Sequence, residues 1–148
     1  KLCKELDIMK YEFSILDLEQ SNIFWEKTRK LQVFTSLQES LLRAVVPVSE
    51  TFEVIQKLKK YKINYFLDWG GSLIWLQIEE INTKILKEIK EIIKKAAGYL
   101  TVIKVEEDMK ATIDIFTVDP IKYKISEKIK KSFDPKRILN PGKMYSGI

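Results

Sequence analysis

The closing stretch of the chain, FDPKRILNPGKMY (133–145), carries residues that could bind a charged or carbonyl-rich group. Two X-Pro steps, at 134–135 and 140–141, fix the backbone in turns, and Gly142 follows the second proline directly. The second turn is predicted to expose backbone amides beside Lys143, and such amides with an ammonium group can receive an anion or a carbonyl oxygen. The alternative is that the segment only fastens the last helix.

Few other groups suited to catalysis are present. The chain has no histidine, so the commonest general base is missing. The one cysteine, Cys3, cannot form an internal disulfide, which is typical of a reducing compartment. A zinc or iron site would have to be built from carboxylates and one thiol, so we expect no metal site.

Length and composition indicate one soluble domain over 1–148. The apolar fraction is 45% and the charged fraction 32%, as in globular proteins. No apolar run is long enough to cross a bilayer, and the start does not have the form of a signal peptide. The chain begins at Lys1 in mid-pattern, without a methionine, so we expect that an upstream part is missing.

The net charge of +5 does not predict nucleic-acid binding. The basic residues are mostly lysines, with no arginine-rich strip and no basic motif interleaved with aromatics. On the predicted helix that follows Asn82, lysines alternate with glutamates at helical spacing, which favours ion pairs between Lys84 and Glu88 and between Glu91 and Lys95. This pattern is typical of a solvated helix face.

The order of predicted elements over 41–105 is strand, helix, strand, strand, helix, strand. The strands are 41–48, 64–69, 72–78 and 99–105; one helix is 50–61, capped by Ser49, and the other runs from the cap Asn82 to Gly98. Gly70 and Gly71 form the tight reversal between the second and third strands. This order predicts an α+β, ferredoxin-like (split βαβ) antiparallel sheet with both helices on one face.

Helical extensions are predicted on both sides of this unit. The C-terminal extension (119–148) begins with Asp119 as cap and Pro120 in the first turn, and isoleucines recur every four residues from Ile121 to Ile129. Ile138 and Leu139 then form a short apolar anchor. At the other end, 21–34 predicts a helix around Phe24 and Trp25, and 11–16 a further strand.

Side-chain alternation separates a core face of the sheet from an open face. In the first strand Leu42, Ala44, Val46 and Val48 face the helices, whereas Arg43 lies on the open face between Leu41 and Val45. The third strand, the expected central neighbour, places Ile74, Leu76 and Ile78 in the core and Leu73, Trp75 and Gln77 opposite. An arginine among aromatic residues on a sheet is costly unless an anion or another surface covers it.

Two interpretations of Arg43 remain open at this point. In the first, it faces a ligand or an interface. In the second, it pairs with Asp68, the aromatic residues pack against Trp25 or the N-terminal segment, and Trp69 with the glycines is only part of the hairpin.

The closing FDP followed by NPGK resembles the C-terminus of FAD-linked oxidases of the vanillyl-alcohol oxidase (PCMH-type) superfamily. Together with FWEKTRKLQVF, LLRAVVPV and DWGGSLIWL, it makes the chain from Phe24 onward similar to the C-terminal half of the FAD-binding subunits of glycolate oxidases. The resemblance implies a cap domain that covers the flavin while glycolate, a 2-hydroxy acid, is oxidised to glyoxylate.

Residue roles and partners follow from the same resemblance. Asn140, Pro141, Gly142 and Lys143 would lie near the isoalloxazine or at the interface with the FAD-binding domain. Arg43, Asp68, Trp69 and Trp75 would line the substrate side, where an arginine suits a carboxylate. FAD would be held in the full-length protein and not by this fragment alone.

The implied partners are the chain's own N-terminal FAD-binding domain, a catalytic flavin subunit and an iron–sulfur subunit. The implied location is the cytoplasm or, through the complex, the periphery of the inner membrane. The alternative is a non-catalytic ferredoxin-like domain that binds an effector or mediates assembly. The sequence upstream of Lys1 would discriminate between the two, because the oxidase requires a glycine-rich FAD-binding half there.

Overall fold

The computed structural model describes residues 13–34, 40–110, 112–117, 119–143 and 145. The chain divides into two compact units, 1–35 and 36–148, which are described separately. In the described parts, no helix combines the length and the apolar character needed to span a membrane.

The N-terminal unit contains helix α2 (Leu18–Arg29). Its start is fixed by a capping box, in which Asp17 accepts the Gln20 amide at 2.8 Å and the Gln20 side chain accepts the Asp17 amide at 3.1 Å. The predicted helix around Phe24 and Trp25 is therefore confirmed and begins earlier than expected. The predicted strand at 11–16 is wrong for 13–16, which is irregular, while 11–12 lies outside the described residues.

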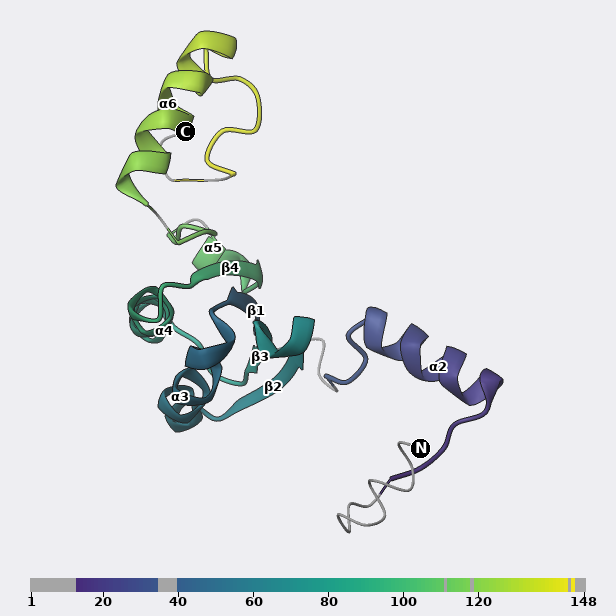
Figure 1. Ribbon diagram of the computed structural model, residues 1–148. Coiled ribbons are helices and arrows are strands. Elements are labelled where there is room, and N and C mark those ends of the chain that lie inside the picture. Colours follow the sequence, from purple (N-terminus) through teal and green to yellow (C-terminus); the bar gives the residue numbers. More distant parts are fainter. Residues whose placement is uncertain (1–12, 35–39, 111, 118, 144, 146–148) are drawn as a thin grey trace. The chain divides into compact units, whose positions relative to one another are not determined.

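The second unit is built on a four-stranded antiparallel sheet (Figure 1). Its strands are β1 (Ser40–Val45), β2 (Ile63–Asp68), β3 (Leu73–Ile78) and β4 (Tyr99–Lys104). The spatial order is β2-β3-β1-β4, so β1 and β3 are the central neighbours, as expected. The α+β class is confirmed.

Helices α3 (Val48–Leu58) and α4 (Thr83–Lys95) lie on the same face of this sheet (Figure 1). The short 3₁₀ helix η1 (Lys59–Tyr61) follows α3. The core between helices and sheet consists of fully buried aliphatic side chains, chiefly Leu42, Ala44, Val54, Leu58, Ile74, Leu76, Ile78, Ile89, Ile93 and Leu100. Burial of one such side chain contributes about 1.5–3 kcal/mol, so this layer holds the sheet in place.

The predicted start of α3 is wrong in two respects. The helix begins at Val48 behind Pro47, without a side-chain cap, so Ser49 does not cap it. Val48, which was expected in the core, is 57% exposed, and Phe52, which has the helical spacing of Ile55 and Leu58, is 72% exposed. The buried residues of α3 are Thr51, Val54, Ile55 and Leu58; Phe52 lies beside this stripe, and Val48 lies in the first turn, ahead of it.

Both predicted boundary signals of α4 are observed, with a difference at the end. Asn82 caps the helix by accepting the Ile85 amide at 2.9 Å. The left-handed residue after the helix is Ala97 (φ 54°) and not the glycine. Gly98 is required for space, because a Cβ there would come within 2.5 Å of the Val45 carbonyl oxygen.

The outer edge of β4 is covered by the segment that leads to the last helix. The Val102 amide donates to the Ile115 carbonyl at 2.8 Å, and the Thr117 amide donates to the Leu100 carbonyl at 3.0 Å. A short helix, α5 (Glu107–Lys110), lies in the connection, and helix α6 (Pro120–Phe133) follows. This pairing protects an edge that would otherwise be open to another strand.

Candidate functional site

Arg43 lies between two indole rings on the open face of the sheet. Its guanidinium carbon is 5.1 Å from the ring centroid of Trp69 and 5.9 Å from that of Trp75. Trp75 is brought there by strand register, since Arg43 and Trp75 are directly opposite in β1 and β3. Each such cation–π contact contributes roughly 0.5–2 kcal/mol, depending on how far it is removed from water.

Two further side chains lie in the same row of the sheet. Phe66 of β2 is opposite Trp75, and Thr101 of β4 is opposite Arg43. Residues at one register level of a sheet point to one face, so Phe66, Trp75, Arg43 and Thr101 lie side by side, all half-buried, on the face away from the helices. This face is less open than predicted, because Leu73 and Gln77, which were expected on it, are buried. Phe66 and Thr101 were not predicted, although side-chain alternation along β2 and β4 places them on this face.

Trp69 reaches the guanidinium through an unusual backbone. It has φ 52°, followed by Gly70 at 63° and Gly71 at 97°, so three successive residues have positive φ. This conformation is open to glycine but strained for a bulky residue, and such strain persists only where surrounding contacts hold it. The predicted reversal at Gly70 and Gly71 is thus present and begins one residue earlier, at Trp69.

Contacts from the neighbouring elements hold this loop. The buried Thr51 hydroxyl of α3 donates to the Gly71 carbonyl at 2.7 Å, and the Val46 amide donates to the Ser72 carbonyl at 2.9 Å. The loop carrying Trp69 is therefore bound both to a helix and to the end of β1. Thr51 was also missed, because its own sequence context indicates only a helix.

Asp68 does not form the alternative ion pair with Arg43. Its carboxylate accepts the amide of Trp69 at 2.7 Å and so caps the turn. Within the described part of the chain, no carboxylate is ion-paired with Arg43. Among the described residues the half-buried guanidinium thus has no ion-paired carboxylate at its N–H edge. A planar carboxylate, which accepts two parallel N–H bonds, is the group that fits this edge best.

The other predicted site residues lie in the tail that follows α6. Asp119 caps the helix as expected, accepting the amides of Ile121 and Lys122 at 2.8 and 2.9 Å. The helix ends at Phe133, and turns at 134–137 and 140–143 follow, each closed by a backbone hydrogen bond. The predicted helix stop and both turns are therefore observed.

The tail is anchored differently from the prediction. Ile138 and Leu139 are 72% and 61% exposed, so they are not an apolar anchor. The anchor is the buried carboxylate of Asp134, which accepts their two amides at 3.1 and 2.9 Å and forms an ion pair with Lys130 at 2.7 Å. The Lys130 hydrogen bond and these amides lower the pKa of Asp134 to about 2.

Past this anchor, the chain turns back along α6 (Figure 1). Tyr145 is buried and contacts the rings of Tyr123 and Phe116 edge-on, at centroid distances of 5.7 and 6.1 Å. Between these ends lies the turn of Asn140, Pro141, Gly142 and Lys143, all four exposed. Among the described residues no contact joins this turn to Arg43 or the two tryptophans, so a single site formed by both groups stays a prediction.

The tail leaves the apolar side of α6 uncovered. It contacts Tyr123, Glu127 and Lys130, with Arg137 lying 3.9 Å from Glu127. The isoleucines at 121, 125 and 129 point to another side of the helix and are exposed, together with Phe133. The sequence predicted this periodicity but could not show that the chain's own tail occupies the other side.

No group of three or more potential ligand side chains that could hold a metal ion occurs among the residues described by the structure.

One family model matches the C-terminal part of the chain. Residues 116–144 match the model of a family described as FAD linked oxidases, C-terminal domain. This segment includes Phe116, which forms an isolated bridge with Thr101 of β4, all of α6 and both turns. The resemblance to FAD-linked oxidases inferred from the closing motif is confirmed.

A curated relative extends the similarity over most of the chain. Glycolate oxidase subunit GlcE of Escherichia coli (strain K12) is 26% identical over 131 residues, which are 88% of this chain. They are 33% of the relative, so the chain spans about a third of its length. No solved structure matches the chain.

Proposed function

We propose that this chain, whose tail is that of an FAD-linked oxidase C-terminal domain, covers the flavin of an oxidoreductase that oxidises a small 2-hydroxy acid, with glycolate as the first candidate. The observation that supports this proposal most is Arg43. A half-buried guanidinium between two indole rings, with no ion-paired carboxylate in the described residues, is suited to the carboxylate of such a substrate.

The residues of the chain would position and shield the substrate. Arg43 would bind the carboxylate in a bidentate manner and so orient the 2-hydroxy carbon, while Trp69 and Trp75 would exclude water from the same place. Strengthened electrostatics in the dry site would favour the bound anion. Asp68 would contribute indirectly, because it caps the turn that carries Trp69.

The side chains and amides of this chain are suited to contact an FAD that is bound mainly by another part of the protein. The open face offers aromatic surface and one cation, and the turn at 140–143 offers exposed amides with the ammonium of Lys143. Nothing crowds this turn at Gly142, where a Cβ would meet no atom within 4 Å. Bound FAD would supply the electron-accepting chemistry, and Asn140 to Lys143 would contact its ring or the domain that holds it.

The exposed isoleucine face of α6 supports the same arrangement. Its members Ile121, Ile125 and Ile129 are 72%, 53% and 54% exposed, and Phe133 is 85% exposed. A contiguous apolar stripe of this kind marks a surface that another polypeptide covers. We assign it to the FAD-binding part of the same protein, with the flavin and iron–sulfur subunits as further proposed partners.

The experiment is the reduction of bound flavin by glycolate in the full-length protein under anaerobic conditions. Arg43→Gln should lower kcat/KM by roughly 30-fold or more, the effect of removing one partner of a desolvated charge pair, with the FAD content unchanged. Arg29→Gln, which removes an exposed arginine of α2, is the matched control and should have no effect.

Three outcomes have different meanings. Flavin bleached by glycolate in the wild type but poorly in Arg43→Gln supports the proposal. Equal kcat/KM in both proteins would remove Arg43 from the site. A full-length protein without visible flavin absorbance would exclude the oxidase and favour the effector-binding or assembly alternative.

A further inference from the structure

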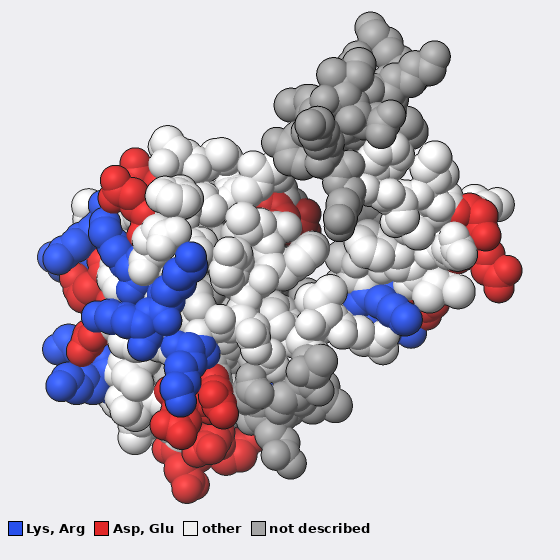
Figure 2. Space-filling view, turned by 90° about the horizontal axis from the view of Figure 1, so that it is seen from below, with Lys and Arg blue, Asp and Glu red and all other residues white. Residues whose placement is uncertain are grey.

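A second site candidate lies on the helical side of the sheet, away from the open face. A groove of about 360 Å³ runs between η1 and α4, within the size range of ligand-binding pockets. Figure 2 shows basic side chains, interspersed with acidic ones, on the part of the surface where α3 and α4 lie. The groove combines such lysines with an apolar floor, namely Lys60, Lys84, Lys87 and Lys95 with Tyr61 and Ile92.

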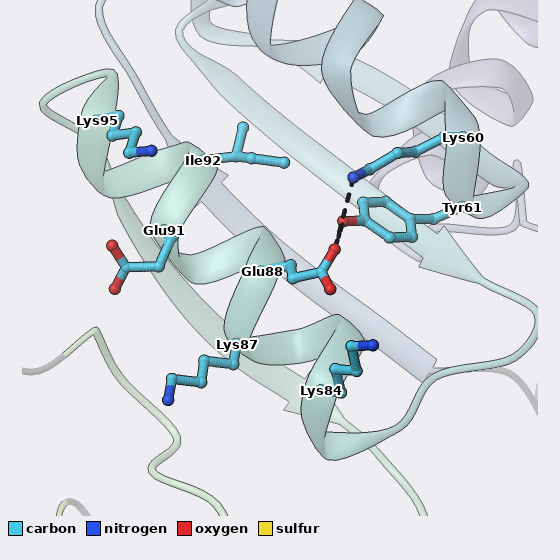
Figure 3. A pocket seen from close by; sticks show the side chains of 8 residues that line it. All are labelled: Lys60, Tyr61, Lys84, Lys87, Glu88, Glu91, Ile92 and Lys95. Atoms are coloured by element: carbon cyan, nitrogen blue, oxygen red, sulfur yellow. Dashed lines mark hydrogen bonds and ion pairs between the residues drawn. The ribbon is translucent and has the colours of Figure 1, made fainter.

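The carboxylate at the centre of the groove is already neutralised. Glu88 accepts the Tyr61 hydroxyl at 2.5 Å and lies 3.5 Å from the Lys60 ammonium (Figure 3). The Tyr61 hydrogen bond, assisted by Lys60, lowers the pKa of Glu88, so this carboxylate is held in its charged, partnered form. Glu88 is therefore directed toward η1 instead of along its own helix.

The consequence is a surplus of positive charge along α4. The ion pairs predicted between Lys84 and Glu88 and between Glu91 and Lys95 are not among the ion pairs of the described residues. Lys87 likewise has no ion-paired carboxylate there. Lys84, Lys87 and Lys95 are exposed, so the predicted solvated face is observed, but the groove is lined by four lysines and only two carboxylates, Glu88 and Glu91, and carries a surplus of positive charge.

The geometry of these lysines distinguishes between kinds of anion. Lys84 and Lys95 are eleven residues apart on one helix, which corresponds to about 16 Å along the axis. In Figure 3 the side chains of Lys84 and Lys87 point in different directions and do not converge on one point. A compact phosphate needs converging donors, whereas an extended chain with several carboxylates can contact lysines spread along a helix.

We propose that this groove binds an acidic, extended segment of a partner polypeptide, with one apolar side chain of that segment seated on Tyr61 and Ile92. The segment would run along α4, its carboxylates contacting Lys84, Lys87 and Lys95 in turn. About five extended residues span the distance. The surface is separate from Arg43, so binding here and substrate binding there can occur together.

The test is the binding of a fluorescein-labelled peptide, Glu-Glu-Leu-Glu-Glu, to the complete chain, followed by fluorescence anisotropy. The double variant Lys87→Gln/Lys95→Gln should weaken binding about five- to thirtyfold, since each exposed charge pair contributes up to about 1 kcal/mol. The matched control, Lys124→Gln/Lys128→Gln, removes the same charge from exposed positions of α6 and should change binding less than about twofold.

Further arms separate this site from general attraction to a basic protein. A peptide with Gln for each Glu should not bind, and raising the salt from about 0.02 to about 0.2 M should weaken the original peptide. Absence of peptide binding, or equal losses in both double variants, would overturn the proposal. So would displacement of the peptide by inorganic pyrophosphate at matched ionic strength, because it would indicate a site for small anions.

Discussion

The indole of Trp69 lies 5.1 Å from the guanidinium carbon of Arg43, and Trp69 adopts a left-handed backbone (φ 52°) to place it there. Such a conformation costs a non-glycine residue about 1–2 kcal/mol. The cation–π contact and the Thr51 hydrogen bond to the same loop thus hold Trp69 in its strained conformation. A strained backbone next to a candidate binding group is the pattern expected where position matters more than stability.

This strain can be measured by comparing two variants that both lose the indole. Trp69→Gly should be more stable than Trp69→Ala, with a free energy of unfolding about 1 kcal/mol higher, because glycine accepts the left-handed conformation without a Cβ penalty. Trp75 in β3 is the matched control: its glycine variant should be less stable than its alanine variant. Urea unfolding followed by circular dichroism gives both differences, and equal stability of the two Trp69 variants would contradict the strain.

Thr51 is predicted to hold the loop that presents Trp69. Thr51→Val keeps the shape but leaves the Gly71 carbonyl without its 2.7 Å donor, at a cost of about 1–2 kcal/mol. Thr28→Val removes an exposed hydroxyl of α2 that donates within its own helix and should change stability by less than about 0.5 kcal/mol. Urea midpoints measure both effects, and an equally small change in the two variants would show that the bond does not fix the loop.

Much of the sheet could be predicted because it depends on local signals. Alternation in β1 and β3 gave the pairing of Arg43 with Trp75, and the side chain of Asn82 marked the start of α4. Exposure could not be predicted in the same way. The spacing of Phe52 fits the helical period of α3, but its side chain lies outside the buried stripe. Which side of a helix is buried depends on how the helix packs, and the spacing alone does not give it.

The candidate site shows the same division between local and tertiary causes. The topology predicted that Arg43 lies on an open face, but the placement of Trp69 depends on a left-handed residue that is not a glycine. The role of Asp134 was also missed. Its position in an FDP motif indicates a turn, whereas its buried ion pair with Lys130 requires the chain to fold back.

Asp134 predicts a pH dependence in the acid range. Its pKa is lowered from 3.8 to about 2 in the folded chain, so its carboxylate contributes stability above pH 3.8 that is lost as the pH falls through about 2. Asp134→Asn should be less stable than the wild type at pH 5, and the difference should shrink toward pH 2. Asp108→Asn, at an exposed position, is the control. A constant difference across urea titrations from pH 5 to pH 2 would refute this role.

The exposed face of α6 gives the last prediction, which depends on the proposed function. Ile125 is 53% exposed, so Ile125→Asp should change the stability of this chain by less than about 0.5 kcal/mol. If the FAD-binding part covers this face, the same change removes a buried apolar contact of about 1.5–3 kcal/mol and adds a charge there. The full-length variant should then retain less FAD on gel filtration, measured as the ratio of flavin to protein absorbance. Lys124→Asp, at an exposed position on the side of the same helix away from Ile125 and Ile129, should retain FAD as the wild type does. Equal retention in Ile125→Asp would mean that another surface contacts the FAD-binding part, and Arg43 could then still serve the substrate.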